Sequence, residues 1–495
     1  MKLASFKSVL SLLLCLAAHS AFAAVQSPWL NSVRSIPKIQ MKDYTKVVEM
    51  KQWVVHLGGP HEERVSAVAQ TDDNGYVILG STTSFNAKET DVWLVRLDSD
   101  GGVVWQKKFG WSKDDFTGPM IRTQDNAFLM AGTTNSLSND EGKDVWIAKA
   151  DENGALLWKK ILFVGAVEVG FRQLMELDNG DVILVGYATT DAGGMRAPML
   201  VKINKDGAAL WGRSYPKGVA PVGAGAPWRI SLMPTSDGGQ LLSAAAGVQD
   251  PEHGYGAGTR LVKLNPSGGV EWEKRYGGLR NDYSVGTVET PDQGYLILAN
   301  SNSYGADIDD DHMTLTKVDY YGEVEWVKML DSIPDPMDYQ DEESAHAVYP
   351  TFNGMMVFGH KKNVIFLSLL KTDASVQWDR NYGMSDYDLN PAAALKTADS
   401  GWVMVATATP KGYGPGVDDD IVVIKVDNNG KLSPACEASD EVPYNPNAPM
   451  PVTDVGGANS PDLIIQGHVP TPTPMMNAPQ DFLKDTISDV VKVCQ

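Results

Sequence analysis

Carboxylates that lie close together in the sequence are the residues of this chain best suited to chemistry. Asp307, Asp309 and Asp311 alternate with other residues, and a second acidic run, "DYQDEE", follows at 338–343. Alternating carboxylates supply the oxygen ligands that a hard cation such as Ca2+ prefers. The series is not an EF-hand loop, because Val318 stands where such a loop needs its bidentate Glu. The three aspartates are therefore a candidate calcium site, and solvated acidic loops are the reading that we favour over it.

Two further groups of polar residues give weaker signals. The run "DDD" at 418–420 is a second acidic cluster. The histidines beyond residue 23 are scattered, at His56, His61, His253, His312, His346, His360 and His468. No Ser, His and Asp share a local signature such as a nucleophile elbow. The sequence therefore nominates no catalytic residue, although enzymes do assemble sites from distant loops.

One tryptophan recurs in the same local phrase along the chain. The seven copies are Trp53, Trp105, Trp158, Trp211, Trp272, Trp326 and Trp378. Successive copies are 52 to 61 residues apart, and most follow an Asp/Asn-x-x-Gly turn such as "DSDGGVVW" at 98–105. Asp, Asn and Gly tolerate the positive φ that a tight hairpin needs. In the last copy, "KTDASVQW" at 371–378, the Asp lies two residues closer to the Trp and the glycine is missing.

A second turn lies about midway between the tryptophans, as in "DNGYVILG" at 73–80 and "DGGQLLSA" at 237–244. Each unit then contains four short apolar strands separated by turns, with no helical periodicity. A period of about 50 residues with four strands per unit is typical of a β-propeller. We predict an all-β fold, a seven-bladed propeller of four-stranded antiparallel blades over residues 51–434.

The two ends of this region are incomplete in complementary ways. After the strand at 420–427 the position due for a tryptophan is Pro434, so the last blade lacks its fourth strand. The segment "KQWVVHLGG" at 51–59 is a fourth strand with no blade before it. Joining them removes two exposed sheet edges. We predict that the Trp53 strand completes the blade begun by residues 385–427.

A cation stands two positions before the Asp or Asn of every tryptophan turn. The set is Arg96, Lys149, Lys202, Lys263, Lys317, Lys371 and Lys425. If this strand is third in its blade, the cations lie in the outer half of the disc. Because an unpaired buried charge is costly, we expect them to pair with acids on neighbouring strands. We likewise expect each tryptophan to pack between blades, because one large ring at the same place in every blade fits a packing role better than sugar stacking.

The Asp-x-x-Gly-x-x-x-Trp turn resembles the tryptophan-docking repeat of PQQ-like propellers and the blade repeats of bacterial cell-surface propellers. The similarity spans roughly residues 51–434 and implies the propeller fold. Quinoproteins of the PQQ-like family have eight blades and an Asp-x-x-Thr-Gly turn, whereas here Thr is absent and seven blades are counted. The sequence also has no vicinal cysteine pair and no Cys-x-x-Cys-His. The resemblance therefore does not predict a bound quinone.

The connections after the second and fourth strands of a blade reach the same face of the disc. Long acidic segments such as "STTSFNAKETD" at 81–91 and "TPKGYGPGVDDD" at 409–420 fall there. The opposite face has mostly short Asp/Gly hairpins. Because loops on a rigid scaffold usually carry recognition, we expect the long-loop face to be the binding surface.

The regions outside the propeller have other signals. Residues 1–23 read as a cleaved secretory signal ending at Ala21-Phe22-Ala23, and residues 24–50 as a short extension. Residues 435–495 are a proline-rich tail, with apolar residues at helical spacing in "DFLKDTISDVVKV" at 481–493. Cys436 and Cys494 are the two cysteines after the signal, and we expect a disulfide between them in an oxidising compartment.

The net charge and the predicted export limit the classes of partner that this protein can bind. The formal net charge of −20 disfavours nucleic acid and anionic lipid as partners. No stretch beyond the signal is apolar for the length that a membrane span needs. We therefore expect an exported, monomeric propeller, periplasmic or extracellular, that binds a protein, glycan or envelope component through its acidic loop face without catalysis. The alternative is a propeller enzyme, either quinone-dependent or a hydrolase or lyase with a loop-built site. Ca2+ is the only cofactor that the sequence indicates.

Overall fold

The fold is taken from a computed structural model of the chain. The structure describes residues 51–433, 452–454, 476–477 and 490–494. Within the first range, it leaves out residues 86, 88, 111, 137–143, 163–168, 190–195, 216–229, 251–253, 279, 304–311, 331–342, 353 and 412–417. In the described part of the chain there are strands and turns but no helix, and hence no helix that could cross a bilayer.

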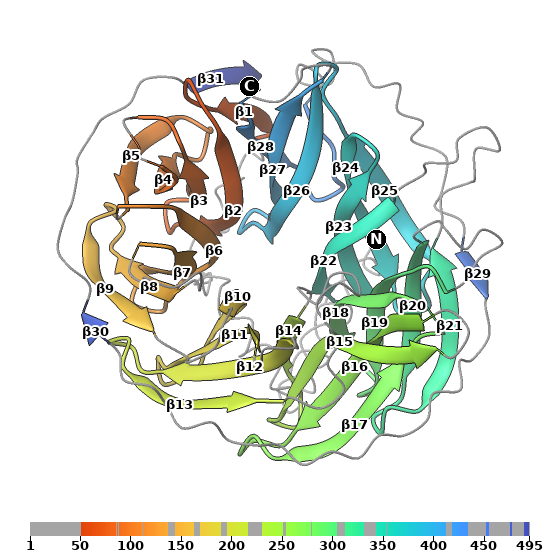
Figure 1. The fold of residues 1–495 in the computed structure, drawn as a ribbon. Helices are drawn as coiled ribbons and strands as arrows, with labels where there is room; N and C mark the ends of the chain where they lie inside the picture. Colours follow the sequence, from red (N-terminus) through yellow and green to blue (C-terminus); the bar gives the residue numbers. More distant parts are fainter. Residues whose placement is uncertain are drawn as a thin grey trace, which may run out of the picture.

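Seven antiparallel sheets stand around a central axis, and the innermost strand of each is the first of its blade in the sequence (Figure 1). Blades 1 and 2 contain β2 (Glu63–Gln70), β3 (Tyr76–Thr82), β4 (Asp91–Leu97), β5 (Val103–Phe109), β6 (Asp115–Arg122), β7 (Phe128–Thr134), β8 (Asp144–Ala150) and β9 (Leu156–Leu162). Blades 3 and 4 contain β10 (Val169–Glu176), β11 (Val182–Thr189), β12 (Arg196–Ile203), β13 (Ala209–Ser214), β14 (Ile230–Pro234), β15 (Gln240–Asp250), β16 (Gly254–Leu264) and β17 (Val270–Tyr276).

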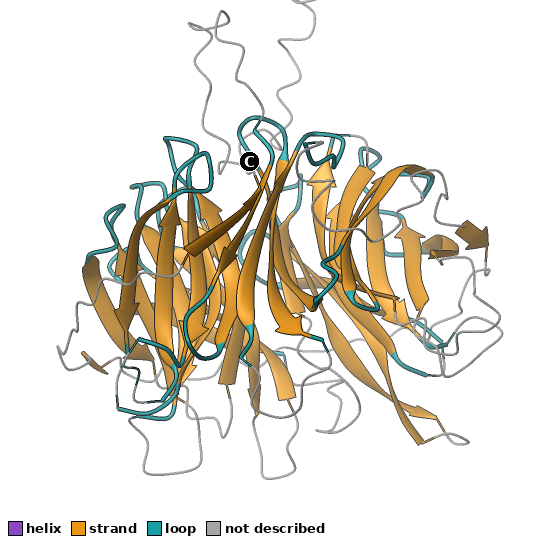
Figure 2. Cartoon of the chain, turned by 90° about the horizontal axis from the view of Figure 1, so that it is seen from above, coloured by secondary structure: helices purple, strands orange, loops and turns teal. Residues whose placement is uncertain are grey.

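Blades 5 and 6 contain β18 (Asp282–Glu289), β19 (Tyr295–Ser301), β20 (His312–Val318), β21 (Val324–Leu330), β22 (Glu343–Thr351), β23 (Gly354–Lys361), β24 (Val364–Lys371) and β25 (Val376–Tyr382). Blade 7 contains β26 (Tyr387–Lys396), β27 (Trp402–Pro410), β28 (Asp420–Val426) and β1 (Trp53–Leu57). The strands run from one face of the disc to the other, and their connections gather at the two faces (Figure 2). The predicted seven-bladed, all-β propeller is therefore confirmed.

The strands follow from composition and from the turns between them. The second and third strands of blade 1 are buried on both faces, because neighbouring blades cover them, and they are correspondingly rich in Val, Ile and Leu. The tryptophan turns have a residue at positive φ, for example Gly101 at 76° and Gly154 at 73°. Only a residue without a Cβ adopts this conformation without strain, which explains the repeated glycine.

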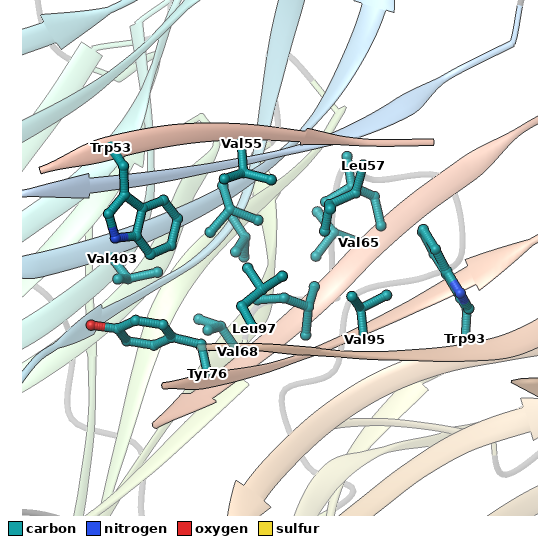
Figure 3. Close-up of a cluster of buried hydrophobic side chains, with 14 residues drawn as sticks. Trp53, Val55, Leu57, Val65, Val68, Tyr76, Trp93, Val95, Leu97 and Val403 are labelled. Atoms are coloured by element: carbon teal, nitrogen blue, oxygen red, sulfur yellow. The ribbon is translucent and has the colours of Figure 1, made fainter. Parts of the chain in front are cut away.

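The ring is closed by the N-terminal strand. β1 pairs antiparallel with β28, with Trp53 opposite Lys425 and Leu57 opposite Ile421. Trp53, Val55 and Leu57 point from β1 into a core shared with blade 1, where they meet side chains such as Tyr76 and Trp93 (Figure 3). The predicted pairing of the two incomplete ends is confirmed, and it joins residues more than 350 positions apart in the sequence.

Three short strands of the C-terminal tail lie on the outer edges of three blades (Figure 1). They are β29 (Val452–Asp454), β30 (Met476–Asn477) and β31 (Val490–Cys494). β29 pairs with β21 of blade 5, β30 with β9 of blade 2, and β31 with β1 of blade 7. The helix expected at 481–493 is wrong at its C-terminal end, because residues 490–493 form part of a strand whose backbone groups pair with β1. The rest of that segment lies outside the described residues.

Candidate functional site

The predicted calcium ligands Asp307, Asp309 and Asp311 lie outside the described residues, so the calcium site stays a prediction. Of the acidic run at 338–343 only Glu343 is described, and its carboxylate lies 2.8 Å from the Lys361 ammonium. The disulfide also stays a prediction, because Cys436 is outside the described residues. Among the described residues, no three His, Cys, Asp or Glu side chains are placed to hold a metal ion.

Polar side chains gather instead where the ring closes, on the long-loop face. We call His56, Glu63, Arg64, Asp419 and Asp420 the closure cluster. His56 lies on β1, Glu63 and Arg64 begin β2, and the two aspartates lie at the start of β28. The cluster forms because β1 and β28 run side by side and the connection at 58–62 then leads directly into blade 1.

His56 and Asp420 form a partly exposed pair in this cluster. Nε2 of His56 lies 3.1 Å from Oδ2 of Asp420, and the two side chains are 16% and 23% exposed. The edge of the imidazole meets the Tyr387 ring at a centroid distance of 5.2 Å and an angle of 81°. The Nε2 atom itself is buried and lies within ion-pair distance of the carboxylate without making a hydrogen bond to it.

Glu63 is the buried acid of the cluster, with no exposed surface. Its carboxylate accepts hydrogen bonds from the Gly59 N–H at 2.7 Å and the Thr82 hydroxyl at 2.6 Å. Burial raises the pKa of Glu63, against the lowering effect of these hydrogen bonds, and the charge of Asp420 adds to the rise. The cluster therefore contains two acids in unlike environments, one buried and one partly exposed.

Arg64 and Asp419 tie blade 1 to blade 7. Nε of Arg64 donates to Oδ2 of Asp419 at 3.1 Å, and the Thr409 hydroxyl donates to Oδ1 of Asp419 at 2.6 Å. The Glu63 N–H donates to the Asp419 carbonyl at 2.7 Å. Asp419 thus makes contacts with blade 1, while Asp420 meets His56. The weaker acidic cluster predicted at 418–420 is separated into different contacts and does not form a shared cation site with other described residues.

The repeated tryptophans lie on the outermost strands of the blades, and five of them lie beside the turn glycine of the next blade. Trp53 is 1% exposed and its Nε1 donates to the Ser99 carbonyl at 3.0 Å. The other six are half-buried. A Cβ built on Gly154 would lie 2.7 Å from the Trp105 ring, and one on Gly207 would lie as close to Trp158. This placement supports the inter-blade packing role, which stays a prediction.

Six of the seven predicted cations form an ion pair with an acid from the turn between the first and second strands. The pairs are Arg96–Asp73 at 2.5 Å, Lys149–Asp125 at 2.7 Å, Lys202–Asp181 at 2.8 Å, Lys263–Asp237 at 2.7 Å, Lys317–Asp292 at 2.9 Å and Lys425–Asp399 at 2.9 Å. Most of these cations are almost fully buried, and Lys263 has no exposed surface. The expected pairing with acids on neighbouring strands is confirmed for these six.

Lys371 is the exception, and its assignment to the set was wrong. In each other blade the cation lies opposite the tryptophan of the fourth strand, but Trp378 lies opposite Leu369. Lys371 begins the turn itself: its N–H donates to the Ser375 carbonyl and its carbonyl accepts from the Ala374 N–H. Ala374, at φ 67°, takes the place of the glycine. Counting from Asp373 placed the cation two residues too late.

Sequence reasoning missed the pairing of His56 with Asp420 and the burial of Glu63. The signal was present in the predicted closure, because pairing the segment at 51–59 with that at 420–427 brings a His and an Asp to adjacent strands. Glu63 gave no signal of its own, since many of the other acids in this chain also flank turns.

No protein-family model matches the chain, and no curated protein matches it in sequence. Solved structures of propellers do match. The β-propeller domain of the Trilobed protease from Pyrococcus furiosus covers 79% of this chain and 98% of its own, at 7% identity and a TM-score of 0.41. Acylaminoacyl peptidase from Pyrococcus horikoshii covers 70% of this chain at 11% identity and a TM-score of 0.41. Puromycin hydrolase covers 72% at 12% identity and a TM-score of 0.37.

The chain spans 50% of the acylaminoacyl peptidase and 61% of the puromycin hydrolase, so it corresponds in length to part of those proteins. The prediction of a non-catalytic scaffold is wrong. It was drawn from the lack of a local catalytic signature in a propeller sequence, and the matched proteins include peptidases and another hydrolase that contain such a propeller. The likeness is one of fold alone, so an activity has to be argued from the residues of the site.

Proposed function

We propose that this propeller is a hydrolase whose reaction takes place at the closure cluster. The observation that carries the proposal is the pair of His56 and Asp420. The imidazole lies 3.1 Å from a carboxylate, is partly exposed, and lies on the face where the long connections meet. A histidine held by an acid is the most common general base of proteins near neutral pH.

In the proposed reaction His56 acts on water, so that no nucleophilic side chain is needed. The step requires a small turn of the imidazole that directs an Nε2 proton at Asp420, because Nε2 makes no hydrogen bond in the structure. Nδ1 then takes a proton from water while the water oxygen attacks the acyl carbon of an ester or amide. The imidazolium then returns that proton to the leaving oxygen or nitrogen as the acyl bond breaks. Asp420 orients the ring and stabilises its charged form.

Glu63 and Arg64 would act as positioning residues. Glu63 holds the Gly59 N–H, which fixes the connection between His56 and blade 1. Arg64 holds Asp419, the residue next to Asp420 in the sequence. Both keep the start of β28 and the end of β1 in one arrangement, which a proton-transferring pair requires.

The experiment is an assay of the purified protein on chromogenic esters, aryl amides and glycosides. We expect turnover of an ester or amide, and a loss of about 100-fold or more in kcat for His56→Gln and Asp420→Asn, the usual contribution of a general base. His312→Gln is the matched control, because His312 begins a third strand in blade 5 as Asp420 does in blade 7. Circular dichroism and thermal melting establish that each variant is folded.

Two results would overturn the proposal. One is the absence of turnover of every ester and amide by the folded wild-type protein. The other is turnover that His56→Gln leaves unchanged, which would place the chemistry elsewhere on the ring.

We further infer that the protein is exported after cleavage behind Ala23 and that its blades are related to tryptophan-docking propeller repeats. The first inference rests on the charged and apolar pattern of residues 1–23. The second is supported by the five tryptophans that lie beside the next blade's turn glycine. A mature N-terminus other than Ala24, found by sequencing the protein recovered from cells, would contradict the export proposal.

A further inference from the structure

The outer strand of each blade presents a free edge unless another segment covers it. A strand edge is a row of unpaired backbone N–H and C=O groups, which readily accepts a further strand. Three of the seven edges, those of β21, β9 and β1, are paired with strands of the C-terminal tail. Within the described residues, the edges of β5, β13, β17 and β25 have no such strand.

The order of the three tail strands follows the ring. β29 lies on blade 5, β30 on blade 2 and β31 on blade 7. Residues 455–475 therefore connect blade 5 with blade 2, and residues 478–489 connect blade 2 with blade 7.

We propose that the C-terminal tail binds the rim of the propeller as a belt of added strands. Its three described strands hold the free edges of β21, β9 and β1. The last of them, β31, keeps the closing strand β1 in place, and we call this pairing of β31 with β1 the lock. The occupant of each edge is this chain's own tail.

The belt makes the closure of the ring depend on both ends of the chain. β1 is bonded to β28 on one edge and to β31 on the other, with Leu57 opposite Val490 and His56 opposite Val491. A closing strand held on both edges separates from its blade only after the C-terminal strand has left. The belt is independent of any hydrolytic activity.

The test of the lock uses the full chain with Val491→Pro and Lys492→Pro combined. Proline has no N–H, and of two adjacent strand residues one directs its N–H to the neighbouring strand. We expect amide hydrogen exchange in residues 53–57 to become at least tenfold faster. The control is Val491→Ala with Lys492→Ala, which keeps the N–H groups and should exchange like the wild type. All measurements are made under reducing conditions, so that a bond between Cys436 and Cys494 cannot hold the tail.

A synthetic peptide of residues 488–495 provides a second measurement of the lock. We expect it to bind the double-proline variant and to restore slow exchange in β1, and not to bind the alanine control, whose edge is occupied. Equal exchange of β1 in the two variants, together with no binding of the peptide, would overturn the lock.

Discussion

The aspartates that pair with a cation on the short-turn face and the buried acids Glu63 and Asp282 on the long-loop face have opposite pKa shifts, although both groups accept hydrogen bonds from hydroxyls and backbone N–H groups. On the short-turn face, burial alone would raise the pKa of Asp237, but Lys263, the Thr235 hydroxyl and the Gly239 N–H bring it down to about 2. On the long-loop face, burial raises the pKa of Glu63 despite its hydrogen bonds from Thr82 and Gly59.

Asp282, which begins the inner strand of blade 5, behaves like Glu63. Burial raises its pKa even though Ser301, Ser303 and the Gly278 N–H donate to its carboxylate. The paired turn aspartates are less buried than Glu63 and Asp282, and each has a cation within ion-pair distance. Burial raises the pKa of Glu289, on the same short-turn face, although Ser236 donates to its carboxylate. The comparison indicates that the partner charge and the depth of burial set the direction of the shift, since neutral donors are present on both faces.

The largest expected effect comes from removing the cation of one pair. Lys263 has no exposed surface, and its ammonium lies 2.7 Å from Asp237 and 3.2 Å from Glu271. Lys263→Met leaves two acids without their shared partner, and we expect a loss of about 3 kcal/mol in the free energy of unfolding. The measurement is urea denaturation at pH 7, with Lys371→Met as the control. Lys371 is exposed and lies in a turn, so the control should change stability by less than about 0.5 kcal/mol. Equal losses of stability in both variants would show that the buried ion pairs of Lys263 contribute no more to the free energy of unfolding than an exposed lysine does.

The blade repeat and its cation–aspartate pairs could be predicted from the sequence. Hairpins, strand alternation and the position of Arg96 or Lys263 relative to the tryptophan are local features. The fold, the closure by Trp53 and six ion pairs followed from them. Lys371 was misplaced because Ala374 supports the turn without a glycine, which hid its true start.

The closure cluster could not be predicted in the same way. His56 and Asp420 are 364 residues apart, and only their places on paired strands bring the side chains within 3.1 Å. The raised pKa of Glu63 depends on burial by blade 7 and by the connection at 58–62, and burial of one acid among many is not visible in a sequence.

A smaller effect is expected from the pH dependence of Asp237. Its folded pKa of about 2 lies below the ordinary value, so its contribution is present at neutral pH and is lost as the pH falls from about 4 to 2. We expect Asp237→Asn to cost at most about 2 kcal/mol at pH 7, because the side chain is partly solvated, and almost nothing near pH 2. Urea denaturation of both proteins across this range measures the difference between their free energies of unfolding. A difference that stays constant with pH would contradict the lowered pKa of Asp237.

The smallest expected effect has the opposite sign, and it concerns Glu63. A raised folded pKa stabilises the fold below the unfolded value, and that contribution is lost as the pH rises through the folded value. Gln at position 63 does not titrate, so the stability of Glu63→Gln relative to the wild type should improve as the pH rises from about 4 to 8. Asp237→Asn, measured in parallel, should show no improvement over that range, because Asp237 is fully ionised throughout it. If the stability of Glu63→Gln relative to the wild type instead falls with rising pH, the buried acid is stabilised in its charged form. Its pKa shift would then have the same direction as that of Asp237.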